Sequence, residues 1–253
     1  MKFRKAQFKK LLWGIPLAIL LLAGGVSYAA RDFDGVNDQI SWGSLSQITN
    51  LSTISFSCWI YSTNVTADHA VFNFTNDRMN LYQDDVGSAS GRTDMFKIHI
   101  RESSTISFAE IEGTTNSAKV NQWQHVFISF TPNVAGGLQL WVDGVEDAQS
   151  PVTTSAVDDI GWSGDTMYFG EDPGSSRDRN GKMAECAWWN RVLTDSEIIA
   201  LSKGFAPSFF RNGMVFYSTI IGNNSPEIDM REGASGTLTG TTNAIHPRIM
   251  YPR

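Results

Sequence analysis

Apolar and polar side chains alternate over many short runs of this chain. In residues 54–60 the even positions are all apolar, which is the period-two pattern of a strand with one buried face. Residues 125–130 and 138–142 follow the same pattern. The connection between them contains Gly136 and Gly137, which can adopt the positive φ angles of a hairpin loop. The pattern therefore predicts antiparallel strands.

Further strands are expected at residues 95–101 and 106–111, and a single helix near residues 195–203. Thr194 and Glu197 have the spacing of a capping box, apolar residues follow on one face, and a glycine ends the segment. One short helix after many strands argues against alternating βαβ units. We predict an all-β fold, a two-sheet antiparallel jelly-roll sandwich.

The first 29 residues have the layout of a secretory signal peptide. Five basic residues come first, a run of apolar residues from Leu11 to Val26 follows, and small residues end the segment. The apolar run is short for a membrane span. We expect export of residues 30–253 to the periplasm, the cell surface or the medium, with an uncleaved membrane anchor as the alternative.

Removal of that segment makes the chain strongly acidic. Five of the 20 basic residues and none of the 26 acidic residues lie in it, so the net charge becomes 15 − 26 = −11. Such a chain is not expected to bind nucleic acid, nor a membrane except through an uncleaved signal segment. Binding of a divalent cation is compatible with this charge.

Four segments of the chain resemble one known family. They are residues 31–42 (RDFDGVNDQISW), 123–130 (WQHVFISF), 138–145 (LQLWVDGV) and 181–197 (GKMAECAWWNRVLTDSE). In this order and spacing they are similar to laminin-G-like domains, which have the concanavalin A-like jelly roll of lectins and glucanases. The resemblance implies a jelly-roll domain over residues 30–204. Residues 205–253 are expected to form a C-terminal extension that packs on the sandwich or continues it, and they resemble the tail of laminin-G-like domains in phage-encoded structural proteins.

The two cysteines, Cys58 and Cys186, each lie in a predicted strand, and the family places these two strands side by side. In an oxidising compartment they are expected to form a disulfide. The alternative is a pair of buried free thiols, which behave as small apolar side chains.

The resemblance also suggests calcium sites. The turn over residues 34–38 and the strand that carries Glu185 lie close together in the family, so Asp38 and Glu185 are candidate ligands of a structural Ca²⁺. Ala184 replaces an acidic residue that the family more often has. The alternative is an Asp-Gly turn and a strand carboxylate paired with Arg191 or Lys182.

A second candidate metal site combines Asn76 and Asp77 with Glu171 and Asp172. Pentraxins, which share the sandwich, hold calcium with an Asp-Asn pair and an acidic loop at comparable places. The alternative is a set of ordinary polar loops.

Catalytic residues are not expected. Residues 227–232 (EIDMRE) resemble the carboxylate motif of laminarinase-type glucanases, but the flanking glycines, Asn and Pro predict a solvated turn in the C-terminal extension. Of the eight Trp residues, most are expected in the core, Trp59 and Trp123 among them. Trp162, in a glycine-flanked loop, is the candidate for stacking on a sugar.

Together these observations predict an exported, non-catalytic module that binds carbohydrate or a partner protein of the cell envelope or extracellular space. A structural or assembly protein of virion or surface type is the first alternative, and a glycoside hydrolase is the second.

Overall fold

The computed structural model describes residues 28–48, 51–86, 91–101, 108–147, 150–154, 164–222 and 224–252. The predicted signal segment lies outside these ranges except for its last two residues, which begin the first strand. Trp162 also lies outside the described residues. Within them, no helix is long and apolar enough to cross a bilayer.

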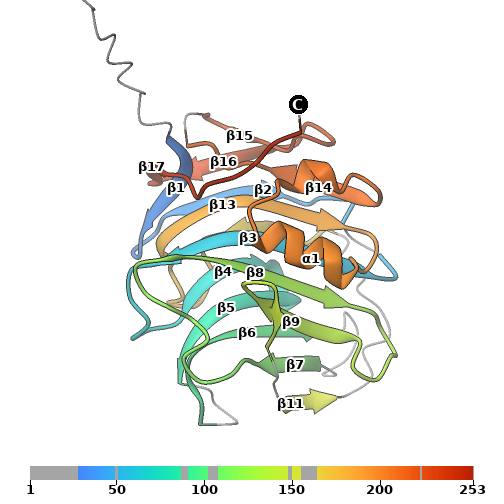
Figure 1. The fold of residues 1–253 in the computed structure, drawn as a ribbon. Helices are drawn as coiled ribbons and strands as arrows, with labels where there is room; N and C mark the ends of the chain where they lie inside the picture. The colour runs from blue at the N-terminus through green and yellow to red at the C-terminus, as the bar shows by residue number, and fades with distance from the viewer. Residues whose placement is uncertain are drawn as a thin grey trace, which may run out of the picture.

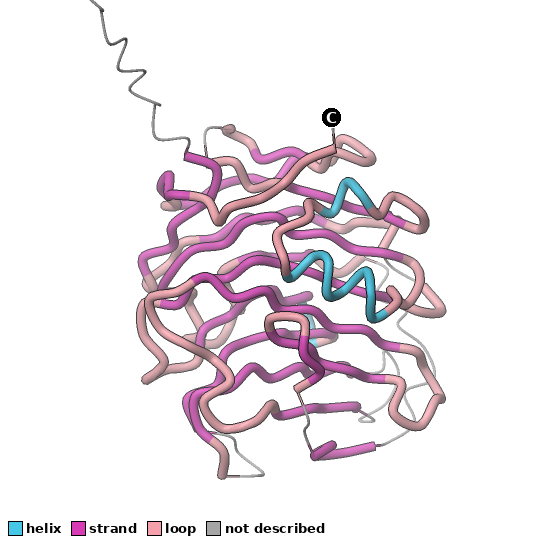
Figure 2. The backbone as a smooth tube through the Cα atoms, in the orientation of Figure 1, coloured by secondary structure: helices cyan, strands magenta, loops and turns pink. Residues whose placement is uncertain are grey.

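The described residues form two antiparallel sheets packed face to face (Figures 1 and 2). One sheet has eight strands, in the order β10-β9-β8-β3-β13-β1-β17 with β14 also paired to β13. Its strands are β1 (Tyr28–Asp34), β3 (Ile54–Ser62), β8 (Trp123–Phe130), β9 (Leu138–Val142), β10 (Val145–Glu146), β13 (Asn180–Trp189), β14 (Met214–Ser218) and β17 (Thr242–Ile245).

The other sheet has nine strands, in the order β11-β7-β6-β5-β4-β12-β2-β16-β15. Its strands are β2 (Gln39–Gly43), β4 (His69–Phe74), β5 (Met79–Val86), β6 (Thr93–Arg101), β7 (Phe108–Glu112), β11 (Ser150–Thr154), β12 (Met167–Phe169), β15 (Glu227–Ile228) and β16 (Ser235–Thr239). The jelly-roll sandwich predicted from the alternation of side chains is confirmed.

One continuous apolar core fills the space between the sheets. Fully buried aromatic side chains form its centre, where Phe56 and Trp188 from the eight-stranded sheet contact Phe72 from the other, with ring centroids 4.6–4.9 Å apart. These contacts follow from the period-two pattern, since alternate residues of each strand face inward.

The C-terminal extension is part of both sheets. β14 pairs with β13 and β17 with β1, whereas β16 pairs with β2. The sandwich therefore does not end at residue 204.

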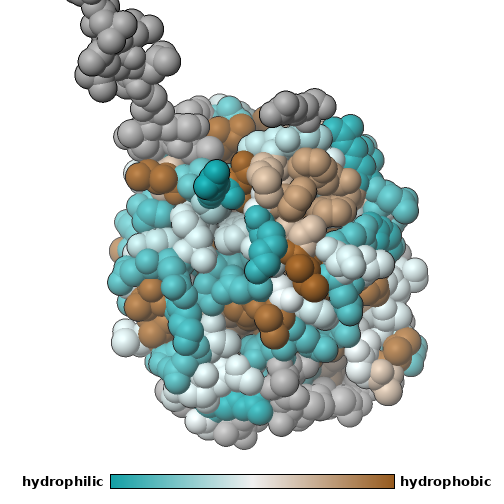
Figure 3. All heavy atoms as spheres, in the orientation of Figure 1, coloured by the Kyte–Doolittle hydropathy of each residue, from teal (hydrophilic) through white to brown (hydrophobic). Residues whose placement is uncertain are grey.

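The helix lies on the outer face of the eight-stranded sheet. In α1 (Asp195–Ser202), Thr194 and Glu197 make the predicted capping box, and Ile198 and Leu201 are buried. They belong to a second apolar cluster that includes Phe127 of β8. Two short 3-10 helices, η1 (Thr75–Asp77) and η2 (Pro207–Phe209), complete the described helices. Figure 3 shows apolar side chains gathered on this face around α1 and η2, where Ile199 and Phe209 are exposed.

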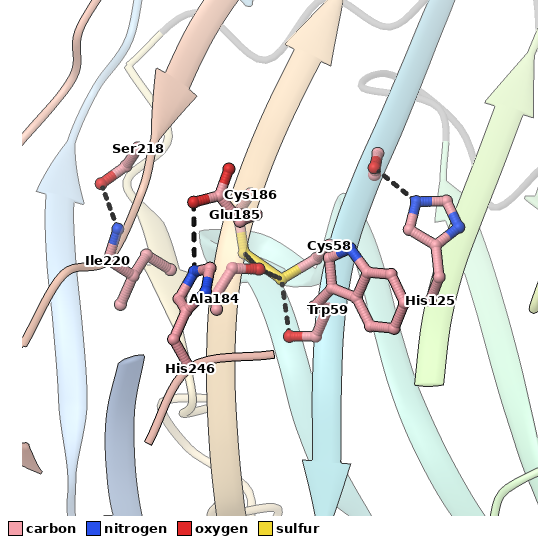
Figure 4. The surroundings of a disulfide bond; sticks show 10 residues. Cys58, Trp59, His125, Ala184, Glu185, Cys186, Ser218, Ile220 and His246 are labelled. Carbon is pink, nitrogen blue, oxygen red and sulfur yellow. Dashed lines mark hydrogen bonds and ion pairs between the residues drawn. A yellow bond between two sulfur atoms is a disulfide. The ribbon is translucent and has the colours of Figure 1, made fainter. Parts of the chain in front are cut away.

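A β-bulge in β13 determines which way its side chains point. Ala184 pairs with Trp59 and Ala187 with Ser57, so Glu185 and Cys186 together oppose Cys58. Glu185 has a φ of 57°, and the extra residue returns Cys186 to the core side of the sheet. Of the two alternatives for the cysteines, the structure has the disulfide (Figure 4).

The imidazole of His125 is fully buried on the outer side of β8, 2.8 Å from the Ser57 hydroxyl through Nε2. Burial lowers the pKa of His125 to about 3. In the unfolded chain the imidazole of His125 takes up a proton as the pH falls below about 6.5, whereas in the folded chain it does not. Stability should therefore be lost as the pH falls from 6.5 towards 3, by roughly 2 kcal/mol at pH 5.

Urea unfolding of wild type and His125→Gln at pH 7 and pH 5 measures this contribution. The loss of unfolding free energy between the two pH values should be roughly 2 kcal/mol larger for the wild type. Equal losses would contradict the prediction.

Candidate functional site

The outer face of the nine-stranded sheet is polar although much of it is buried. Leu81 of β5, Ile98 of β6 and Ile111 of β7 point into the core. Because side chains alternate along a strand, the residues between them point outward. Most of these outward residues can donate or accept hydrogen bonds.

The strand register aligns these side chains into a row across five strands. Tyr168 of β12 lies opposite Asn73 of β4, Asn73 opposite Asn80, Asn80 opposite His99, and His99 opposite Glu110 of β7. Asn73 and Asn80 are each 2% exposed. The row therefore forms a recessed line of hydrogen-bonding groups and one phenol ring.

A second row contains Tyr82, Lys97 and Glu112, which also lie opposite one another. The Lys97 ammonium lies 3.0 Å from a Glu110 oxygen, 3.1 Å from a Glu112 oxygen and 3.8 Å from an Asp84 oxygen. Burial alone would lower the pKa of Lys97, but Tyr82, Glu110 and Glu112 outweigh it and raise the pKa above its ordinary value. Lys97 therefore stays charged and organises the carboxylates around it.

A cluster of charged side chains around Arg177 borders the two rows. The Arg177 guanidinium lies over the Tyr82 ring at 4.4 Å from its centroid and forms ion pairs with Asp68 and Asp172. Asp172 also accepts a hydrogen bond of 2.6 Å from Asn73 Nδ2. The Oδ1 atom of Asn73 is buried and has no hydrogen-bond partner among the residues that the structure describes. An acceptor in this state requires a donor from water or from a bound molecule.

We call these two rows and their border the polar face, and define it by its members: Asp68, Asn73, Asn80, Tyr82, Asp84, Lys97, His99, Glu110, Glu112, Tyr168, Asp172 and Arg177. Its carboxylates, amides and phenols are suited to hydroxyl-rich ligands, because each can accept or donate hydrogen bonds in a fixed direction.

The predicted ligand pair Asp38 and Glu185 does not come together. Asp38 closes the turn after β1, where its Oδ2 accepts a hydrogen bond of 2.9 Å from Asp34 N. Asp34 pairs with Asn180, five residues before Glu185 on β13. At about 3.3 Å per residue, the backbone of Glu185 lies roughly 16 Å along the strand from the pair of Asp34 and Asn180.

Glu185 is instead used within the fold. The bulge directs it to the outer face, where Tyr217 and Tyr251 each donate a hydrogen bond of 2.6 Å and His246 lies 3.1 Å away. Figure 4 shows His246 reaching the carboxylate from the C-terminal segment. Both carboxylate oxygens are occupied, so a calcium site built on this pair does not fit.

The second predicted set is divided between the two ends of β12. Asn76 donates a hydrogen bond of 2.5 Å to Asp165, which precedes β12. Glu171 and Asp172 follow β12, and Asp172 contacts Asn73 and Arg177. Burial, with repulsion from Asp178 and Asp172, raises the pKa of Glu171. Only Asp172 of the predicted set joins the polar face, while the Asp77 side chain lies outside the description.

The glucanase-like motif has a structural role. Glu227 is 1% exposed and accepts a hydrogen bond of 2.8 Å from Arg31, and Asp229, also 1% exposed, accepts from three backbone amides. The expectation of a fully solvated turn was wrong for these two residues, because Glu227 holds the C-terminal extension to β1 and Asp229 ties its own turn to β14. Glu232 is exposed, as expected.

Three further features bear on ligand binding, one at the edge of the polar face and two away from it. The carboxylates of Asp68, Asp84 and Asp85 lie within 4.8 Å of one another, but Arg177 and Lys97 already pair with two of them. A surface pocket of about 420 Å³ beside β9 and β10 has no aromatic lining.

The third feature is an aromatic group on the outer face of the eight-stranded sheet. Trp59 and Trp123 are half-buried there, contrary to the expectation that they belong to the central core. They pack against Ala184 and against Ala244 of the C-terminal segment, so the chain itself covers part of them.

The family can now be assigned. A family model described as the concanavalin A-like lectin/glucanase superfamily matches residues 34–199. The chain belongs to this superfamily. The matched residues include every strand of the polar face, and both sheets of the sandwich extend beyond them into the C-terminal segment.

Solved structures share the concanavalin A-like fold at low sequence identity. A proposed carbohydrate-binding protein from Bacteroides ovatus is similar with a TM-score of 0.65 and 20% identity, over 88% of this chain and 62% of its own. A heptameric pentraxin from Limulus polyphemus is similar with a TM-score of 0.56 and 12% identity, over 87% of this chain and 96% of its own. No protein with a curated description matches the sequence significantly.

Most residues of the polar face were absent from the candidates drawn from the sequence. Asn80, Tyr82, Lys97, Glu110 and Glu112 all lie in strands with the period-two pattern. The outward positions of three successive strands carry charged and amide side chains, but an ordinary solvent face has the same pattern, so the sequence pattern does not distinguish the two.

Proposed function

We propose that this chain is an exported, non-catalytic carbohydrate-binding module whose ligand lies on the polar face. The observation that carries the proposal is the aligned row from Tyr168 to Glu110, with its unpaired acceptor on Asn73. A sugar supplies many hydroxyl donors, and its ring carbons can pack on a phenol. The superfamily and the similarity to a proposed carbohydrate-binding protein support this choice.

A glycan array tests the proposal. It compares the wild type with two alanine variants, one on each sheet. Asn73→Ala removes the aligned amide, and we expect binding to weaken about tenfold, as for a buried hydrogen bond of about 1.4 kcal/mol. Trp123→Ala removes an aromatic ring from the opposite sheet and should leave glycan binding unchanged.

Melting curves establish that both variants are folded. If Trp123→Ala abolishes binding and Asn73→Ala does not, the ligand lies on the opposite face. A repeat of the array with chelator tests whether calcium takes part.

An assembly role is the alternative, and exposed apolar side chains around α1 favour it. Ile199, Phe209 and Met250 are 41–44% exposed. Figure 3 shows apolar side chains gathered around α1. Self-association that is lost in Phe209→Ser, without loss of glycan binding, would support this second function. A glycoside hydrolase has less support, because Glu227 and Asp229 are engaged within the fold and Glu110 and Glu112 share Lys97.

A further inference from the structure

The polar face carries more carboxylates than cations. Five carboxylates belong to it, those of Asp68, Asp84, Glu110, Glu112 and Asp172, against the two cations Lys97 and Arg177. The balance is 2 − 5 = −3. The next cation along β6 is Arg101, two residues beyond His99, and including it still leaves an excess of two negative charges.

The position of this excess matters as much as its size. Asp84 and Glu112 are 4% and 0% exposed, so solvent screens them weakly. Glu110 is more accessible at 8%, and it ends the row of hydrogen-bonding side chains. One Glu110 oxygen contacts Lys97, whereas the other lies 4.0 Å from His99 Nδ1, beyond hydrogen-bond distance.

A second observation on the same face concerns hydrogen bonding. It indicates that a bound ligand supplies a hydrogen bond that the described residues do not. Asn73 is 2% exposed and donates to Asp172, yet within the described part of the chain its Oδ1 atom has no donor. A ligand that donates a hydrogen bond to Asn73, next to Tyr168 at one end of the row, would extend along the row to Glu110 at the other end. A cationic group of that ligand would then lie near the Glu110 carboxylate.

We propose that the polar face selects glycans by charge, with sugars that carry a free amine preferred over neutral sugars and sugars that carry a carboxylate rejected. This inference rests on the proposed glycan-binding function. The preference follows from the sign of the field, since an ammonium gains attraction from the excess carboxylates and a uronate or sialate meets repulsion.

The experiment measures binding of the full chain to three oligosaccharides of equal length by calorimetry. They are an oligomer of glucosamine, an oligomer of N-acetylglucosamine and an oligomer of glucuronate, each at 20 mM and 300 mM NaCl. At 20 mM salt we expect the glucosamine oligomer to bind about tenfold more tightly than its N-acetylated form, and the uronate not to bind. At 300 mM salt the preference should shrink severalfold.

Two variants locate the effect. Glu110→Gln should reduce the preference for glucosamine at least threefold, because it removes the carboxylate at the end of the row of hydrogen-bonding side chains. Glu232→Gln removes one charge from an exposed turn of the C-terminal segment and should leave the preference unchanged.

Equal binding of the three oligomers, tighter uronate binding, or equal loss of preference in both variants would overturn the inference while leaving glycan binding intact. Failure of every oligomer to bind at either salt concentration would contradict the proposed function itself.

Discussion

Loss of the disulfide between Cys58 and Cys186 should lower the melting temperature by roughly 10–20 °C. The two residues are 128 positions apart in sequence. A cross-link that closes so long a loop restricts the unfolded chain and contributes about 4–5 kcal/mol in the chain-entropy model. For a domain of this size, each kcal/mol corresponds to about 2–4 °C.

The measurement compares the oxidised wild type, the reduced wild type and the double variant Cys58→Ala/Cys186→Ala. The reduced wild type is the matched control, because it loses the cross-link and keeps both sulfur atoms. Both forms should melt well below the oxidised protein. Three coincident melting curves would show that the disulfide contributes nothing to stability.

Replacement of Lys97 by methionine should destabilise the fold by about 3–5 kcal/mol, as when one partner of a buried ion pair is removed. Lys97 is 3% exposed and its ammonium contacts carboxylates of Glu110, Glu112 and Asp84. Methionine retains most of the volume but none of the charge.

Lys182→Met is the matched control. Lys182 pairs with Asp32 at 3.4 Å on the opposite sheet, but both side chains are partly exposed. A surface pair of this kind contributes less than about 1 kcal/mol. Urea unfolding of both variants at pH 7 gives the comparison. If the two substitutions cost the same, the cluster around Lys97 is not a structural centre.

Alternation of apolar and polar residues was sufficient to predict the sandwich. The apolar positions of residues 54–60 all point into the core as expected, and the capping box of Thr194 and Glu197 begins the helix where it was placed. Both signals are local, since they depend on a few neighbouring residues and on fixed backbone periods. Local signals also identified strands β6 and β7, but not what their outward side chains do together.

The sites depended on information that is not local. Asp38 and Glu185 were paired because the family places their segments near each other, yet the strand register holds them apart. The direction of Glu185 depends on one extra residue in β13, which a sequence pattern of period two does not reveal. A shift of one position moves a side chain to the other face of a sheet.

The sequence by itself therefore determined the architecture, the helix and the superfamily, because these depend on the order of short patterns along the chain. The tertiary structure alone decided which polar side chains share a surface. Asn73, His99 and Glu110 come from three different strands, and only the register of the nine-stranded sheet aligns them. The charge of the polar face is a sum over such alignments, so it has no counterpart in any single segment of the sequence.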